Sequence, residues 1–398
     1  MVTGRSGDPG PVGRNSPGGD GRNPDHDATA RPTAPPWWLF EGTGVPLDPA
    51  DRDARWPEAP PWRRFLGVPS EGDPPDDEAE ATRRLGLAAA TLLERSDIGL
   101  VNAAMHLRRP LLITGKPGSG KSSLAYLIAR ELGLGRVLKW PVTSRTTLRD
   151  GVYEYDAIGR AQAALNSRAN LAGHGGTVAK SIARMRVDSR QSGRESEMRP
   201  DPGGPPISDF IRLGPLGTAM VARRLPRVLL VDELDKGDFD LPNDLLNVFE
   251  DGSVVIPELV RLRAASESVT VLTDDPGHTA VVDSGVIRCA EFPIVIVTSN
   301  GEREFSPAFL RRCVRLAVRE PAGDRLNALV RAHFASAENF ADLVRRFEEQ
   351  RDLGDELAAD QLLNAVHLAK AGALDDPQAV DDLLGAVWQS LSPGARPR

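Results

Sequence analysis

The sequence has few cysteines, few histidines and no long apolar run. Its 398 residues include only Cys289 and Cys313, which cannot build a disulfide framework and indicate a reducing compartment such as the cytoplasm. The six histidines show no metal-ligand spacing, so no zinc site is expected. No stretch of about 18 uninterrupted apolar residues occurs, so no membrane span is predicted. The first ten residues also lack the apolar run of a secretory signal.

Excess positive charge is also missing. The formal net charge is −7 and the isoelectric point about 5.6, which argues against a protein that mainly coats nucleic acid. Of the 49 basic residues only six are lysines. We attribute this scarcity to a high-GC coding bias, typical of bacteria. A lysine that persists against such a bias is expected to be required for its own chemistry.

The composition changes along the chain and predicts four regions. Residues 1–36 are rich in Gly and Pro and are expected to be disordered. Residues 37–78 combine tryptophans with prolines, which predicts an arm that is neither helix nor regular strand and docks its rings on the body. The alternative for this arm is an exposed segment that binds a partner. Residues 79–320 read as an α/β domain, and residues 321–398 as a small helical lid domain.

Within the α/β region, short apolar runs alternate with helical patterns. Such alternation predicts a parallel sheet covered by helices on both faces. Residues 160–206 are polar and interrupt this rhythm, so we expect a long insertion or mobile loop there. The apolar runs that predict strands are 110–114, 136–142, 228–232, 292–298 and 314–318.

One motif gives the strongest functional signal. It reads Gly115-Lys116-Pro117-Gly118-Ser119-Gly120-Lys121-Ser122. This fits G-x-x-x-x-G-K-[ST], with an apolar strand before it and a helix after it. The glycines let backbone N–H groups surround a phosphate, and the helix start adds a favourable dipole. Lys121 would reach the β/γ-phosphates and Ser122 would bind Mg²⁺. The competing interpretation is a plain glycine turn between strand and helix.

A pair of acids follows another predicted strand. Asp232 and Glu233 come directly after a run of four apolar residues. Ligands of open α/β sheets bind at the carboxyl ends of the strands, so these acids should face the glycine-rich loop (Gly115–Ser122). Asp232 would then hold Mg²⁺, directly or through water, and Glu233 would deprotonate the attacking water. Acids at a strand end can also serve solubility alone.

Asn300 follows the predicted strand 292–298 in a similar way. Its amide could hydrogen-bond the γ-phosphate or the attacking water. An asparagine that opens a turn before glycine, as here before Gly301, is the alternative.

Together these residues resemble an AAA+ ATPase of the MoxR type, over roughly residues 80–391. The resemblance implies a ring, often a hexamer, that binds ATP and Mg²⁺ between subunits and hydrolyses ATP. Arg312 occupies the position of the arginine finger that a neighbouring subunit supplies, with Arg311 as the fallback and a plain surface arginine as the alternative. The family also implies protein partners, among them von Willebrand factor A domain proteins. Phe249–Leu259 resembles the β-hairpin inserted in the second helix of this group.

One family feature is missing. The lid usually carries a sensor arginine just before a Leu-rich helix, and residues 357–363 contain none.

Two functions follow from these patterns. The first is an ATP-driven, chaperone-like remodeller of partner proteins. The second is a nucleotide-gated assembly switch or scaffold with little turnover. The intact Glu233 favours the first, because a protein that only binds nucleotide needs no base to activate water. The loop and the acids recognise phosphates and metal, not the base, so GTP fits them as well as ATP. A phosphotransferase acting on a small molecule explains neither Arg312 nor the helical lid.

Overall fold

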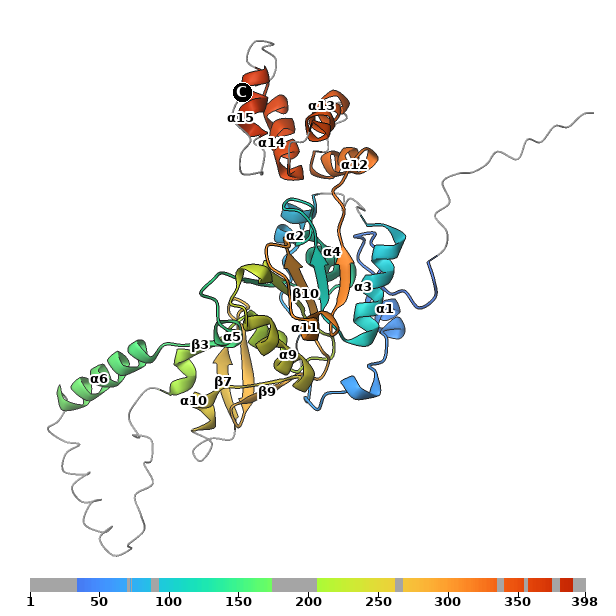
Figure 1. The fold of residues 1–398 in the computed structure, drawn as a ribbon. Coiled ribbons are helices and arrows are strands. Elements are labelled where there is room, and N and C mark those ends of the chain that lie inside the picture. Colours follow the sequence, from blue (N-terminus) through green and yellow to red (C-terminus); the bar gives the residue numbers. More distant parts are fainter. Residues whose placement is uncertain are drawn as a thin grey trace, which may run out of the picture. The chain divides into compact units, whose positions relative to one another are not determined.

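A computed structural model describes most of the chain (Figure 1). The chain divides into two compact units between Pro36 and Trp37, and every element below belongs to the second unit. Residues 1–33 of the predicted disordered tail and residues 174–205 of the predicted insertion lie outside the described ranges. These ranges are 34–69, 72, 74–86, 93–173, 206–261, 268–334, 340–353, 357–373 and 380–388.

The predicted parallel sheet is confirmed. All four neighbouring pairs in this five-stranded sheet run parallel, and its strands are largely buried. The carboxyl ends of β1, β10 and β5 therefore lie at one edge, where Thr114 pairs with Ser299 and Val297 with Val231. In spatial order the strands are β11 (Val314–Ala317), β1 (Leu111–Thr114), β10 (Ile294–Ser299), β5 (Val228–Asp232) and β2 (Leu138–Pro141).

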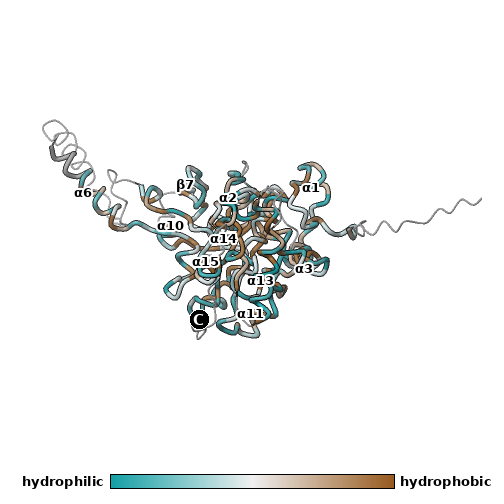
Figure 2. Tube along the Cα trace, turned by 90° about the horizontal axis from the view of Figure 1, so that it is seen from above, coloured by the Kyte–Doolittle hydropathy of each residue, from teal (hydrophilic) through white to brown (hydrophobic). Residues whose placement is uncertain are grey.

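Amphipathic helices pack on this sheet. Helix α4 packs on β5 and on α2, α3 packs on β11, and α8 packs on β2 and β5. In Figure 2 the hydrophobic, brown parts of the chain are concentrated towards the centre of the view. Short helix α5 precedes the second sheet, and α9 follows β5 and packs on α11. The bounds are α2 (Glu78–Leu85), α3 (Arg95–Leu107), α4 (Ser123–Glu131), α5 (Leu148–Val152), α8 (Pro215–Ala219), α9 (Leu241–Asp251) and α11 (Pro307–Leu310).

A second, mixed sheet was not predicted. It has six short strands, and one face is buried through Val254, Val271, Val282 and Ile287 while the alternating residues are more exposed. Strands of three to five residues give too little period-2 signal to be recognised in a sequence. In spatial order they are β3 (Tyr153–Tyr155), β4 (Ile211–Leu213), β7 (Ser268–Leu272), β8 (Thr279–Asp283), β9 (Val286–Arg288) and β6 (Ser253–Val255).

The prediction of a β-hairpin within Phe249–Leu259 is wrong. This segment contains the end of α9, the single strand β6 and the start of α10 (Pro257–Val260). Gly252 ends α9 with a φ of 59°, and β6 then pairs antiparallel with the distant strand β9. The Glu-Asp-Gly turn is therefore a helix terminus rather than a hairpin turn.

The predicted insertion begins with a helix instead of a loop. Helix α6 covers Ala157–Gly173, and β3 and β4, which flank the insertion, pair antiparallel. Asp156 starts the helix, because its Oδ1 accepts a hydrogen bond from Gly159 N at 2.7 Å. The alanine-rich sequence then favours a helix, although none of the side chains of residues 157–167 is buried.

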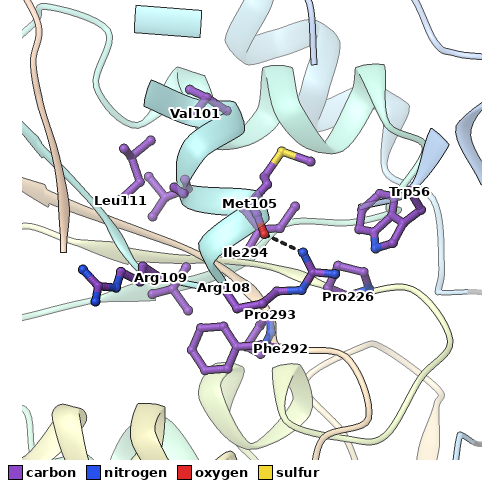
Figure 3. Close-up of a pocket in the computed structure, with 13 residues that line it drawn as sticks. Trp56, Val101, Met105, Arg108, Arg109, Leu111, Pro226, Phe292, Pro293 and Ile294 are labelled. Atoms are coloured by element: carbon purple, nitrogen blue, oxygen red, sulfur yellow. Dashed lines mark hydrogen bonds between the residues drawn. The ribbon is translucent and has the colours of Figure 1, made fainter. Parts of the chain in front are cut away.

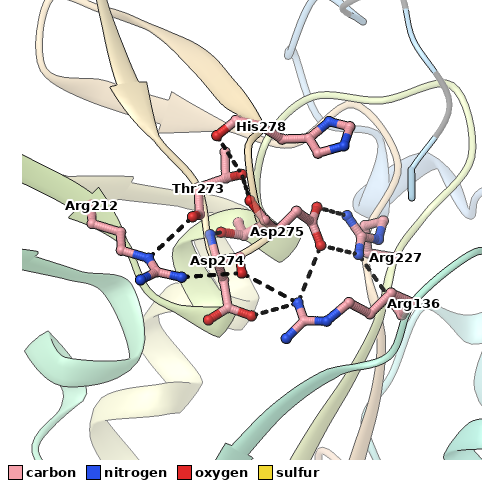
Figure 4. A network of polar contacts seen from close by, with 8 residues as sticks. Arg136, Arg212, Arg227, Thr273, Asp274, Asp275 and His278 are labelled. Carbon is pink, nitrogen blue, oxygen red and sulfur yellow. Dashed lines mark hydrogen bonds and ion pairs between the residues drawn. The ribbon is translucent and has the colours of Figure 1, made fainter. Parts of the chain in front are cut away.

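A buried ion network joins the two sheets (Figure 4). The side chains of Arg227 and Asp275 are 1% and 0% exposed, and Arg227 Nη1 lies 2.5 Å from Asp275 Oδ2. Arg136 contacts both Asp274 and Asp275 through Nη1, at 2.8 and 3.2 Å. Arg136 and Arg227 precede β2 and β5, whereas the two aspartates lie in the turn between β7 and β8. The network therefore ties the mixed sheet to the amino ends of the parallel strands.

The N-terminal arm packs on α3 and α4. Trp38 and Phe40 are buried, and Asn102 Oδ1 accepts hydrogen bonds from Leu39 N and Phe40 N at 2.8 and 3.0 Å. The fully buried carboxylate of Glu131, at the end of α4, accepts hydrogen bonds from the backbone of the arm. Burial raises the pKa of this carboxyl, although those hydrogen bonds oppose the shift.

Two details of the arm differ from expectation. It contains a short helix, α1 (Pro49–Arg55), and a 3₁₀ turn, η1 (Pro61–Arg63), where neither was expected. Asp48 caps α1 by accepting hydrogen bonds from two backbone N–H groups, a local signal the proline content obscured. Trp62 is 75% exposed and does not dock.

The arm also meets the far end of α3 (Figure 3). Trp56 lines a narrow pocket with Met105 and Phe292. Arg108 donates to Pro57 O at 2.6 Å and to Glu291 Oε2 at 3.0 Å, so one buried guanidinium holds the arm, α3 and the segment before β10 together.

The C-terminal helices form a small core of their own around Leu326, Phe347 and Leu362. They are α12 (Asp324–His333), α13 (Ala341–Asp352), α14 (Ala359–Lys370) and α15 (Val380–Val387). None of the helices within the described ranges is both long enough and apolar enough to cross a bilayer.

We expect Asp275→Ala to destabilise the protein strongly. The change leaves Arg227 buried without its charge partner, which costs about 3–5 kcal/mol, and chemical denaturation monitored by circular dichroism measures this loss. Arg345→Ala, which removes the exposed ion pairs of α13, is the control and should change stability little. Equal stability of both variants would show that the buried network does not join the sheets.

Candidate functional site

The glycine-rich loop (Gly115–Ser122) runs from the carboxyl end of β1 to the start of α4. Gly118 and Gly120 adopt φ values of 72° and 83°, which side chains with a Cβ disfavour. Lys121 is 7% exposed, and its Nζ donates to Gly115 O and Lys116 O, both at 2.7 Å. Burial lowers the pKa of Lys121, opposed by the carboxylates nearby. The loop therefore wraps around its own lysine.

A cavity of about 110 Å³ lies next to this loop. Ser119 and Gly120 line it from the loop, Leu93 and Asp97 from the start of α3, and Val318 from the end of β11. The hydroxyl of Ser119 is buried and has no hydrogen-bond partner among the described residues. An unpaired buried hydroxyl is costly, so this position favours a polar ligand or water.

Asp232 gathers donors from three directions. Its Oδ1 accepts hydrogen bonds from Ser122 Oγ at 2.7 Å and from Thr298 Oγ1 at 2.9 Å. Its Oδ2 lies 2.9 Å from Lys139 Nζ. Burial alone would raise the pKa of Asp232, but these three partners outweigh burial and lower it. The carboxylate is therefore ionised and fixed beside the last residue of the loop.

Glu233 and Asn300 also meet. Asn300 Nδ2 donates to Glu233 Oε1 at 3.2 Å, and Lys236 Nζ lies 2.9 Å from Glu233 Oε2. Glu233 adopts the left-handed conformation with φ 61°, and its N–H donates to Thr298 Oγ1 at 2.8 Å. Such backbone strain in a non-glycine residue is typical of functional sites.

Three residues of this site were missed in the sequence. Lys139 and Thr298 hold Asp232, and Asp235 Oδ2 accepts hydrogen bonds from Asn300 N and Glu302 N, both at 3.0 Å. Asp235 is 3% exposed, and its Oδ1 has no partner among the described residues. Because lysine is scarce in this chain, Lys139 could have been singled out in the sequence, but no local pattern indicated that it contacts Asp232.

Arg311 and Arg312 lie at the amino ends of the parallel strands, opposite to the carboxyl ends that the glycine-rich loop and the acids follow. They precede β11, whose first residue, Val314, pairs with Leu111, the first residue of β1. The glycine-rich loop follows the other end of β1, about 10 Å further along the strand. Arg312 Nε donates to Glu250 Oε1 at 2.8 Å, and Arg311 O accepts a hydrogen bond from Arg109. The structure does not bring either arginine to the loop of its own chain.

The C-terminal helices touch the glycine-rich loop. A Cβ built on Gly118 would overlap the Cβ of Ala358, just before α14. Lys116 Nζ lies 3.4 Å from Glu320 Oε1, and Glu320 Oε2 lies 3.9 Å from Arg351 of α13. Arg351 thus pairs with the glutamate that contacts the loop, although Arg351 lies outside the segment 357–363 in which a sensor arginine would be expected.

The donor set fits magnesium. Ser122 and Asp232 offer a hydroxyl and a carboxylate oxygen 2.7 Å apart, and such hard oxygen ligands, completed by water and phosphate, suit Mg²⁺. Within the described ranges no group of three or more His, Cys, Asp or Glu side chains could hold a metal alone. A cation here would therefore take its remaining ligands from water or from a bound molecule.

No protein-family model matches the sequence, and no curated protein matches it. Among solved structures, the chain is distantly similar to a protein of Cytophaga hutchinsonii described as a "putative ATPase", with 11% identity and a TM-score of 0.30. The match covers 64% of this chain and 53% of that protein, so the chain spans about half the length of that protein.

We expect Gly118→Ala to displace the start of α14 from the glycine-rich loop. The new methyl group would overlap Ala358, so hydrogen exchange of the backbone in the first turn of α14 should become faster. Gly301→Ala is the matched control, since Gly301 also has a positive φ of 80° but nothing within 4 Å of the added Cβ. Unchanged exchange in Gly118→Ala would contradict this contact.

Proposed function

We propose that this chain is a Mg²⁺-dependent ATPase of the AAA+ class, similar to the MoxR type, that remodels partner proteins. The observation that supports it most is the convergence of Lys121, Ser122 and Asp232 at one sheet edge, beside the pair Glu233–Asn300. A plain glycine turn would need neither a buried lysine, Lys121, nor a carboxylate, Asp232, that accepts a hydrogen bond from the next residue, Ser122.

Nucleotide binding would use polar groups that now form hydrogen bonds with one another. Lys121 would exchange Gly115 O and Lys116 O for phosphate oxygens, and Ser122 with Asp232 would hold Mg²⁺. The bound ion would neutralise phosphate charge. The cavity beside Ser119 is adjacent to the loop and would receive the sugar or base.

Hydrolysis requires a base and a means to position water. Glu233 is half-exposed, and Asn300 bonds one of its carboxylate oxygens. With Asn300 orienting the water, Glu233 would accept its proton. Asn300 and Lys236 each contact one carboxylate oxygen of Glu233. One of these two contacts must break before that oxygen can accept the proton.

Arg312 would act on a neighbouring subunit. Because it lies at the sheet edge opposite to the loop of its own chain, its charge can reach a phosphate only on another copy. This arrangement favours a ring, for which we propose the hexamer of the MoxR type, with Arg311 as the alternative finger. The C-terminal helices would form its lid. We extend the proposal to a cytoplasmic protein whose partners include von Willebrand factor A domain proteins.

One observation favours the alternative, a nucleotide-gated switch with little turnover. Both carboxylate oxygens of Glu233 already have partners, Asn300 and Lys236. If nucleotide binding leaves these contacts intact, the base stays blocked and the chain would serve as an assembly switch.

We expect Glu233→Gln to bind ATP like the wild type but to release at least about 100-fold less phosphate, the contribution typical of a positioned base. Lys121→Ala should lose ATP binding. A fluorescent ATP analogue measures binding and a phosphate-release assay measures turnover. Lys370→Ala, which removes a lysine of α14 remote from Asp232, is the control for charge. Wild-type turnover no higher than that of Glu233→Gln, with ATP bound by both, would reject the ATPase and leave the switch.

Mixing two inactive variants tests the finger. Arg312→Ala should bind ATP yet lose most turnover, because its neighbour supplies no arginine. Lys121→Ala lacks a working site but retains Arg312, so mixed rings should recover part of the activity. Sedimentation with and without ATP shows whether rings form. Full activity of Arg312→Ala alone would show that this arginine is not the finger.

A further inference from the structure

Within the part of the chain that the structure describes, Lys139 is the one cationic side chain that contacts the proposed metal ligand Asp232, and no motif accounts for it. In the register of β2 against β5, Lys139 pairs with Leu230 and Pro141 with Asp232. Lys139 and Asp232 therefore point to the same face, one pleat apart, and the ammonium reaches Oδ2 at 2.9 Å. Their side chains are 34% and 15% exposed, so water screens the pair only in part.

Lysine is concentrated at this site. Of the six lysines in the chain, Lys121, Lys139 and Lys236 lie among the acids Asp232, Glu233 and Asp235. The six groups have equal numbers of positive and negative charges, and Glu302, near Lys236, leaves one net negative charge. Because nearly all of its negative charge is compensated, the site has little attraction for a divalent cation until another anion enters.

Lys139 is not needed to orient Asp232. The hydroxyls of Ser122 and Thr298 already fix Oδ1, from the glycine-rich loop and from β10. Its ammonium therefore acts chiefly through charge, by compensating the carboxylate that a metal would use.

We propose that Lys139 makes divalent-cation binding conditional on nucleotide, by cancelling the charge of Asp232 when no phosphate is present. This inference rests on the proposed function. Without nucleotide, a cation beside Ser122 would meet a carboxylate already paired with an ammonium. With nucleotide, phosphate oxygens would supply the missing negative charge, so cation and nucleotide bind together. Lys139 thus determines metal affinity through the charge of Asp232, without touching the metal itself.

The test measures metal binding without using turnover. Mn²⁺ is titrated into the full chain and followed by electron paramagnetic resonance, with and without a non-hydrolysable ATP analogue. Lys139→Met keeps the apolar stem and removes the charge. Without the analogue it should bind Mn²⁺ about tenfold more tightly than the wild type, and the gain should shrink when the analogue is present. Lys139→Arg should match the wild type, and so should Lys370→Met, which removes one positive charge from α14.

The outcomes separate this inference from the proposed function. Mn²⁺ affinity in Lys139→Met that equals the wild type, or that also rises in Lys370→Met, overturns the role of Lys139. Weaker Mn²⁺ binding that Lys139→Arg restores overturns it as well, because Lys139 would then be a structural support for Asp232. Tighter Mn²⁺ binding in a chain that binds no fluorescent ATP analogue would uphold the charge effect and reject the nucleotide site.

Discussion

The carboxylate of Asp232 is the contact on which the candidate site depends. Its two oxygens join the end of the glycine-rich loop through Ser122, the strand β10 through Thr298 and the edge strand β2 through Lys139. A group with so many donors keeps its charge although it is largely buried. Thr298 extends the arrangement, because its Oγ1 also accepts a hydrogen bond from the N–H of Glu233. A displacement of β10 would therefore alter the hydrogen bonds of both Asp232 and Glu233.

A second constraint comes from the direction of the parallel strands. The glycine-rich loop, the two acids and Asn300 follow strand ends at one edge, whereas Arg312 precedes a strand and lies at the other. No rotation of side chains closes a gap of several residues along a strand. A complete catalytic set in the proposed function therefore needs two copies of the chain, which would make turnover depend on assembly.

Much of the parallel sheet could be predicted, because its strands are nearly continuous apolar runs and its loop has a fixed glycine spacing. The mixed sheet could not, because each of its strands needs partners far away in the chain, as β6 needs β9. The same reason explains why some site residues could be recognised in the sequence and others could not. Asp232 and Glu233 stand out locally, but the contact of Lys139 with Asp232 exists only once β2 lies beside β5. Helix α1 was missed because prolines dominated the local pattern.

The most direct measurement is a crystal structure of the chain with Mg²⁺ and a non-hydrolysable ATP analogue. The account predicts that Lys121 Nζ contacts phosphate oxygens instead of Gly115 O and Lys116 O, and that the cation lies beside Ser122 and Asp232. An empty loop in which Lys121 keeps both carbonyl contacts, at saturating analogue, would contradict it.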